Sequence, residues 1–203
     1  MPLRPSRQSK LWGVIVNLTE NGPSVVIRPM RRDDVAATVA LALATPLWQR
    51  HGGTPAALTA RLEEGLAASA AIWVADAPAT PEVSQIAGFV WYVVRGAFQR
   101  SGYVMLLGVA DQYRRQGIGR MLMAHAEARL FAEADDIFLL VSDFNTPAQR
   151  FYRQLGYAQI GAIPDYITPG VAELIFRKRQ FRQGRPHEQS FGTAERTTRG
   201  GKP

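Results

Sequence analysis

The spacing of hydrophobic and polar residues along the chain predicts strands and helices that follow one another closely. Short apolar runs rich in β-branched residues are typical of strands, and apolar residues that recur every three or four positions are typical of helices. The predicted strands are residues 24–29, 71–75, 85–94, 103–110, 137–141, 157–161 and 172–177. The predicted helices are residues 34–44, 56–68, 120–134 and 147–155. This order is that of a mixed α/β domain with a central sheet.

Capping residues predict where several of these helices begin and end. Thr54 precedes a proline, which predicts an N-cap followed by the first helical residue. Thr146 precedes a second such proline, and Gln149 is spaced from it for a capping box. Gly156 follows the last helix and suits a C-terminal position with positive φ.

The turn after strand 103–110 carries the most informative chemistry of the chain. That strand is almost wholly apolar, so we expect both of its faces to be covered. Residues 114–119 then read R-x-x-G-x-G, with Arg115 inside the motif and Arg120 directly after it. Glycines allow close approach of a ligand to the backbone, and the free N–H groups at a helix start attract anions. The turn therefore indicates phosphate or pyrophosphate binding.

Two other phosphate motifs do not fit this turn. A dinucleotide fingerprint needs a third glycine where this chain has Leu122. The G-x-x-x-x-G-K-S/T pattern of a P-loop is not present in the sequence. The turn, however, resembles motif A of the GNAT superfamily, the GCN5-related N-acetyltransferases. Residues 145–157, NTPAQRFYRQLGY, resemble motif B of the same family at the expected distance.

The resemblance covers residues 25–179 and implies a fold, an activity and a co-substrate. The implied fold has a central, mostly antiparallel sheet with a splayed parallel strand pair, flanked by helices. The implied activity is direct acetyl transfer from acetyl-CoA to a primary amine of a small molecule, a peptide or a protein. Acetyl-CoA acts as a co-substrate, and no metal is expected. Family members often dimerise, which allows a homodimer here, although no part of the sequence specifies an interface.

The resemblance also implies roles for individual residues. Pantetheine would lie between strands 103–110 and 137–141, with a bulge at Gly108, and Tyr152 would be the general acid that protonates the departing thiolate. Motif A backbone groups would hold the pyrophosphate. The residues expected to bind acetyl-CoA are Leu107, Gly108, Val109, Arg114, Arg115, Gln116, Gly117, Ile118, Gly119, Arg120, Asn145 and Tyr152.

The general base is not fixed by the resemblance. An alkylamine with a pKa near 10.4 is about 99.9% protonated at neutral pH, so a proton must be removed before attack. Many family members use a glutamate on the strand before motif A, but strand 103–110 contains no carboxylate. A water chain remains open, and the candidate side chains are His51, Asp165 and Tyr103.

Two predicted loops, residues 45–53 and 162–170, would flank the thioester and select the acceptor. The residues expected to contact the acceptor are Trp48, His51, Asp165 and Tyr166. Their aromatic rings and single acid are compatible with a cationic amine or a peptide N-terminus. The same aromatic side chains also suit ordinary loop packing, and the sequence does not name the acceptor.

The charge distribution separates the body of the chain from its ends. The net charge is +7 overall, but residues 25–176 carry 13 basic and 14 acidic residues. We therefore expect a flexible N-terminal extension at residues 1–24, an acetyltransferase domain at 25–179, and a basic, disordered tail at 180–203. Nucleic acid is not an expected partner, apart from weak contact of the basic ends with a polyanion.

Composition excludes several classes of protein. The chain has no cysteine, which excludes disulfides, thiolate metal sites and a cysteine nucleophile. It has no apolar run of about 18 residues and no convincing secretory signal, so we expect no membrane association and a cytoplasmic location. Two alternatives to an enzyme stay open, a non-catalytic acyl-CoA-binding sensor or scaffold and a polyanion-binding protein.

Overall fold

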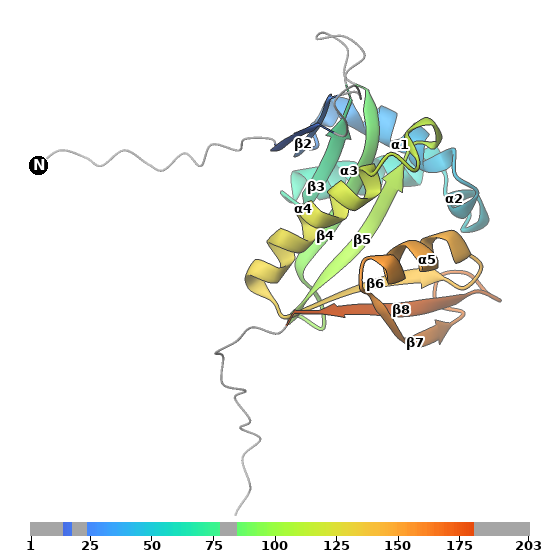
Figure 1. Cartoon of the computed structure of the whole chain (residues 1–203). Helices are drawn as coiled ribbons and strands as arrows, with labels where there is room; N and C mark the ends of the chain where they lie inside the picture. Colours follow the sequence, from blue (N-terminus) through green and yellow to red (C-terminus); the bar gives the residue numbers. More distant parts are fainter. Residues whose placement is uncertain (1–13, 18–23, 78–84, 181–203) are drawn as a thin grey trace, which may run out of the picture.

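A single twisted sheet organises the chain (Figure 1), and the computed structural model describes residues 14–17, 24–77 and 85–180. Within these residues the sheet has eight strands in the order β1-β2-β3-β4-β5-β6-β8-β7. The strands are β1 (Val14–Asn17), β2 (Ser24–Pro29), β3 (Ala71–Asp76), β4 (Ile86–Ala97), β5 (Ser101–Val109), β6 (Asp136–Ser142), β7 (Ala158–Pro164) and β8 (Ala172–Arg179). All neighbours are antiparallel except β5 and β6, as the resemblance implied.

Helices cover both faces of the sheet. The α-helices are α1 (Val35–Leu43), α2 (Pro46–Arg50), α3 (Pro55–Ala67), α4 (Ile118–Glu133) and α5 (Thr146–Gln154), with short 3-10 turns at Arg32–Asp34 and Asp111–Tyr113. Helices α1 and α3 pack with Phe89 and Trp91 in one apolar core. Helices α4 and α5 share the other core, which contains Leu122, Tyr152 and Phe176. None of the helices within the described residues is long and apolar enough to cross a membrane.

The parallel strand pair opens after three residue pairs. Gly102, Tyr103 and Val104 of β5 pair with Ile137, Phe138 and Leu139 of β6, and the two strands diverge beyond this point. The remaining residues of β6 continue to pair with β8, from Leu140↔Ile175 to Ser142↔Glu173. The outer half of β5 thus keeps β4 as its neighbour and exposes its other edge to the gap.

Most predicted elements are confirmed, and the structure differs in one loop, one helix cap, one bulge and one additional strand. Residues 45–53, predicted as a loop, contain the short helix α2, which begins at Pro46 after an extended Thr45. The N-cap of α5 is Asn145 rather than Thr146, because its side chain accepts a hydrogen bond from the Ala148 N–H at 3.3 Å. Gln149 forms no capping box, since its amide donates to the carbonyl of Asp143 at 2.8 Å.

The bulge that the resemblance placed at Gly108 lies at Met105 instead. Leu106 pairs with Trp91 and Val104 with Tyr92, so Met105 is the extra residue on β5.

Within the predicted N-terminal extension, β1 pairs with β2 in antiparallel register and joins the sheet. The expected flexibility of the rest of that extension, and of the tail after residue 180, concerns stretches outside the described residues.

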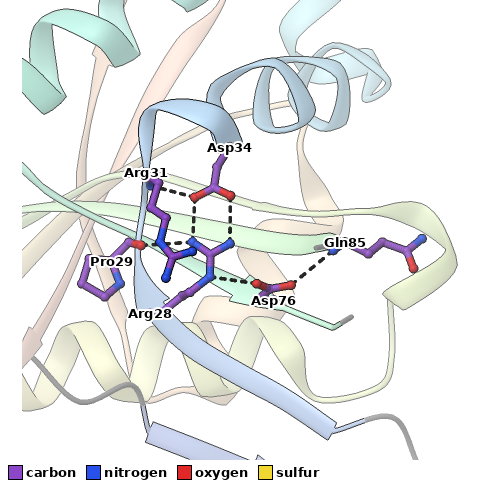
Figure 2. A network of polar contacts seen from close by, with 6 residues as sticks. All are labelled: Arg28, Pro29, Arg31, Asp34, Asp76 and Gln85. Atoms are coloured by element: carbon purple, nitrogen blue, oxygen red, sulfur yellow. Dashed lines mark hydrogen bonds and ion pairs between the residues drawn. The ribbon is translucent and has the colours of Figure 1, made fainter. Parts of the chain in front are cut away.

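A buried ion-pair cluster fastens the chain at the start of α1 (Figure 2). The guanidinium of Arg28 donates to both carboxylate oxygens of Asp34, at 2.7 and 2.8 Å, and to Asp76 at 2.8 Å. Asp34 also accepts the backbone N–H of Arg31. Burial opposes ionisation of Asp34, but the bonds from Arg28 and Arg31 outweigh it and lower the pKa of this carboxyl. The cluster ties β2 to β3 and to the turn before α1.

Candidate active site

A cavity of about 860 Å³ lies where β5 and β6 diverge. Its walls come from the end of α1, from α2, from the outer half of β5, from the turn before α4, and from α5 with the loop before it. The lining residues are Ala42, Thr45, Leu47, Trp48, Leu107, Gly108, Val109, Tyr113, Arg114, Arg115, Gly117, Ile118, Gly119, Arg120, Phe144, Asn145, Pro147, Ala148, Phe151, Tyr152 and Gln154. Eleven of the twelve residues expected to bind acetyl-CoA therefore line one cavity.

The exposed edge of β5 forms the middle of this cavity. The N–H of Ala110 donates to the carbonyl of Ala87 at 2.9 Å and so points toward β4. Successive residues of a strand direct their peptide groups to opposite sides. The peptide groups of Leu107 and Val109 consequently face the gap toward β6, where an extended ligand could pair with them as an added strand would.

The turn before α4 forms the cationic end of the cavity. Arg115 and Gly117 both adopt positive φ, +61° and +85°, which turns the chain sharply into the helix. The Gly117 carbonyl accepts the N–H of Met121, so the N–H groups of Ile118, Gly119 and Arg120 precede the first helical bond and have no helical acceptor. Three exposed arginines line the same end of the cavity, and the helix dipole adds positive potential. This end suits a phosphate or pyrophosphate group.

Three residues of this turn have neighbours outside it or elsewhere in the turn. The side chain of Gln116 donates to the backbone carbonyl of Gln112 at 2.8 Å and does not line the cavity. Arg114 forms an exposed ion pair with Asp111 at 2.9 Å. Gly119 faces α5, because a Cβ atom there would lie 3.3 Å from Cζ of Phe151. A side chain at residue 119 would therefore narrow the cavity between α4 and α5.

Helix α5 brings a buried phenol to the opposite wall. Tyr152 lines the cavity while its ring packs against Tyr157 and Phe176. Burial raises the pKa of Tyr152, and Tyr103 on β5 raises it further. The phenol therefore stays protonated at neutral pH and can donate a proton within an apolar wall.

A partly buried polar cluster lies beside the cavity, at the end of α2. Nε2 of His51 is 2.9 Å from Oγ of Ser142, and the Ser142 hydroxyl donates to Oε1 of Glu173 at 2.9 Å. Nδ1 of His51 is 2.9 Å from the Thr168 hydroxyl. The His51 ring also lies against Phe144, a residue of the cavity wall, with 5.7 Å between ring centroids. This cluster joins α2, β6, β8 and the loop between β7 and β8.

Of the residues predicted to contact the acceptor, only some lie at the cavity. Trp48 lines the cavity, and His51 lies behind Phe144 in the polar cluster. Asp165 accepts the N–H of Gly170 and closes its own loop, and Tyr166 is exposed, so neither lines the cavity. Burial raises the pKa of the Tyr103 phenol, and the nearby groups of Tyr166 and Glu173 raise it further.

Glu173 is the residue that the sequence reasoning missed. It is 2% exposed and lies on β8, a strand that is otherwise mostly apolar through residue 176. A lone carboxylate within such a strand was the available signal, because a buried acid needs a partner. Its partners Ser142 and His51 are 31 and 122 residues away in sequence, so spacing could not connect them.

Comparison with known proteins gives a consistent result. Residues 35–157 match the family described as "Acetyltransferase (GNAT) family". An N-alpha-acetyltransferase from Sulfurisphaera tokodaii is 32% identical over 74 residues, which cover 35% of this chain and 44% of the relative. Blasticidin-S acetyltransferase from Streptomyces morookaense is 37% identical over 76 residues, covering 37% and 55%. The chain thus spans about half the length of the curated relatives it matches.

Solved structures share the fold at low sequence identity. The crystal structure of Ard1 from Thermoplasma volcanium superposes with a TM-score of 0.64 and covers 78% of this chain and 99% of that chain. The identity between the two sequences is 18%, so this likeness concerns the fold.

Proposed function

Because the chain belongs to the GNAT family of acetyltransferases, we propose that it transfers an acetyl group from acetyl-CoA directly to a primary amine. The observation that carries this proposal is the cavity itself, which joins a cationic turn, a free strand edge and a buried phenol in one continuous space. Two relatives are named for acetylation of an N-alpha group and of blasticidin S, so peptide and small-molecule acceptors both belong to the proposal.

The residues present fit the coenzyme from end to end. The pyrophosphate would accept hydrogen bonds from the free N–H groups at the start of α4, close to Arg115 and Arg120. Pantetheine would follow the edge of β5, where Leu107 and Val109 present their peptide groups to the gap. Asn145 lines the opposite wall, although its Oδ1 atom already caps α5.

Acetyl-CoA supplies an activated thioester, and the protein supplies position and proton transfer. Attack by a neutral amine forms the new C–N bond, and the C–S bond then breaks with release of a thiolate. Tyr152 would protonate this thiolate. Burial raises the pKa of the phenol, and an apolar site also makes a desolvated thiolate more basic, which offsets part of that rise.

The experiment has a binding arm and a transfer arm. Calorimetry with CoA should detect binding to the whole chain, and the double variant Arg115→Glu/Arg120→Glu should weaken it at least tenfold. That magnitude follows because hydrogen bonds to ionised groups contribute roughly 1.5–3 kcal/mol each. Arg100→Glu, on the exposed hairpin between β4 and β5, is the matched control and should leave CoA affinity unchanged.

The transfer arm measures release of free CoA thiol from acetyl-CoA with a panel of primary amines and short peptides. Amine-dependent release, with the acetylated product identified by mass spectrometry, supports the proposal. CoA binding without transfer to any amine would instead identify an acyl-CoA-binding module. Absence of CoA binding would refute the assignment of the cavity.

A further inference from the structure

We propose that His51, held by Ser142 and Glu173, accepts the proton that the acceptor's ammonium group must lose before attack. This proposal rests on the proposed function and assigns its missing base. It also specifies the acceptor class, since a site with such a base serves alkylamines that arrive protonated. The geometry of the polar cluster carries the inference.

The directions of the hydrogen bonds fix how the imidazole is protonated. The Ser142 hydroxyl has one proton, and it donates this proton to Glu173. Oγ of Ser142 can therefore only accept from His51, which requires a proton on Nε2. Nδ1 of the neutral ring is then left with its lone pair, opposite the hydroxyl of Thr168. His51 is thus oriented with its basic nitrogen away from the carboxylate, as a proton acceptor needs.

A buried carboxylate lies next to this ring. Glu173 is 2% exposed, and its Oε1 atom lies 3.8 Å from Nε2 of His51. Removing a carboxylate from water is costly unless a positive charge compensates it. Among the described residues, His51 is the cation-forming group recorded within ion-pair distance of Glu173. A proton added at Nδ1 would therefore place an imidazolium beside a counter-charge that is already in position.

Other charged groups around the ring do not supply this counter-charge. On α2, Arg50 is a cation and stacks over the Phe144 ring at 4.2 Å from its centroid. Asp143, after β6, is exposed and accepts the Ala172 N–H at 3.2 Å. The Tyr103 phenol of β5 interacts electrostatically with Glu173 and with Tyr166 of the β7–β8 loop. Glu173 is consequently the group that would stabilise a positive charge on His51.

The position of His51 relative to the cavity is suitable for acceptor chemistry. It directly follows α2, whose Leu47 and Trp48 line the cavity, and its ring lies against Phe144. Tyr152 comes from α5 and lines the same cavity. The proton acceptor and the phenol thus come from different elements that border one space.

With His51 and Tyr152, every proton and every bond of the reaction is accounted for. The ammonium gives one proton to the Thr168 hydroxyl, which passes its own proton to Nδ1 of His51. The amine then bonds to the acyl carbon, the C–S bond breaks, and Tyr152 protonates the sulfur. The acylated nitrogen loses its second proton to the Tyr152 phenolate, and His51 releases its proton to water.

The first test needs neither coenzyme nor acceptor. Imidazole resonances of His51, assigned with His51→Gln and followed by nuclear magnetic resonance, should show the Nε2–H form when the ring is neutral. In Glu173→Gln the fraction of the Nε2–H form should fall, because an amide, unlike a carboxylate, can also donate to Ser142 and no longer fixes the direction of this hydroxyl. Asp143→Asn removes a neighbouring carboxylate outside the cluster and should leave this fraction unchanged. A neutral ring protonated at Nδ1, or an unchanged fraction in Glu173→Gln, would overturn the proposal.

The second test compares two acceptors that differ in basicity. The probes are benzylamine, which is protonated at pH 7, and phenylhydrazine, in which NH replaces the CH₂ group and the terminal amine is mostly neutral. His51→Gln should slow acetylation of benzylamine at least a hundredfold, the low end of a general-base contribution, and that of phenylhydrazine less than threefold. Equal losses with both probes would mean a structural role for His51 and would overturn the proposal.

The two proposals can fail separately. If the wild-type chain acetylates neither probe nor any amine of the panel, the proposed function fails, and the resonance test alone then decides whether the cluster orients His51 as inferred. CoA affinity of each variant, measured by calorimetry, confirms that the cavity is intact.

Discussion

Gly108 on β5 lies so close to Phe89 on β4 that a Cβ atom on residue 108 would be 2.5 Å from Cε1 of Phe89. A second obstacle is Leu41 on α1, whose Cδ2 atom would be 3.1 Å away. Phe89 is fully buried and has no room to move aside. Glycine at this position therefore lets α1 and β4 pack directly against the strand that borders the cavity.

Gly108→Ala should lower the free energy of unfolding by about 1–3 kcal/mol, the usual cost of overpacking a core. Gly161→Ala is the matched control, since a Cβ atom there would lie 3.5 Å from Ile175, an ordinary contact distance. Urea unfolding of the two variants measures the difference. Equal stability of both variants would contradict the packing argument.

Tyr152→Phe should reduce turnover at least tenfold, because it removes the proton that we propose the departing thiolate takes up. CoA affinity should change less than twofold, since the phenol ring and its packing remain. Tyr157→Phe, which removes a hydroxyl from a buried ring outside the cavity lining, should keep turnover near the wild-type value. Initial rates of thiol release and calorimetry measure the two quantities, and undiminished turnover in Tyr152→Phe would remove this residue from the mechanism.

Asp34→Asn should destabilise the fold by at least about 2 kcal/mol. Removing one partner of a buried ion pair costs about 3–5 kcal/mol, and Asp76 still pairs with Arg28 and recovers part of it. Asp33→Asn changes the neighbouring exposed carboxylate and should have little effect. Chemical unfolding at neutral pH compares the two variants.

The contribution of Asp34 should also depend on pH with a definite sign. The pKa of Asp34 is lowered in the fold, so below its ordinary value of 3.8 the unfolded chain takes up a proton first. The stabilisation is therefore present above pH 3.8 and is lost as the pH falls through the lower folded pKa. The difference between wild type and Asp34→Asn should shrink over that range, and a constant difference would contradict the role of its charge.

His125 on α4 should make the fold less stable as the solution becomes mildly acidic. Burial, and then the charge of Arg129, lower the pKa of His125 from 6.5 to about 4. Its ring lies 4.1 Å from that of Trp73, and Nε2 has no hydrogen-bond partner within the described residues. Between pH 6.5 and 4 the unfolded chain binds a proton that the folded chain does not, so the free energy of unfolding falls as the pH decreases.

His125→Gln should flatten this pH dependence. Urea unfolding of wild type and variant at several pH values between 7.5 and 4.5 compares the two slopes. Parallel slopes would show that His125 takes up its proton equally in both states.

The sequence was informative where the determinants are local. The turn from Arg114 to Gly119 could be predicted because glycine spacing and a helix start act within a few residues. Gly156 adopts φ +88° after α5, as its position after an amphipathic helix predicts. The prediction of residues 45–53 as a loop was wrong because composition outweighed a capping pattern, Thr45 before Pro46, that was present.

The polar cluster around His51 could not be predicted because its parts meet only through the tertiary fold. Ser142 and Glu173 face each other through the register of β6 and β8, and His51 reaches them from α2. The bulge at Met105 depends on how β4 and β5 align, which no single residue determines. Strand pairing, rather than local propensity, therefore sets which candidate side chains come together.

Only three backbone pairs join β5 to β6 before the strands part. A coenzyme seated in the gap would bridge the two portions of the sheet and act as a reversible crosslink. We expect bound CoA to suppress amide exchange in β6 and to protect the chain from proteases, so that its cellular lifetime would follow the supply of the coenzyme.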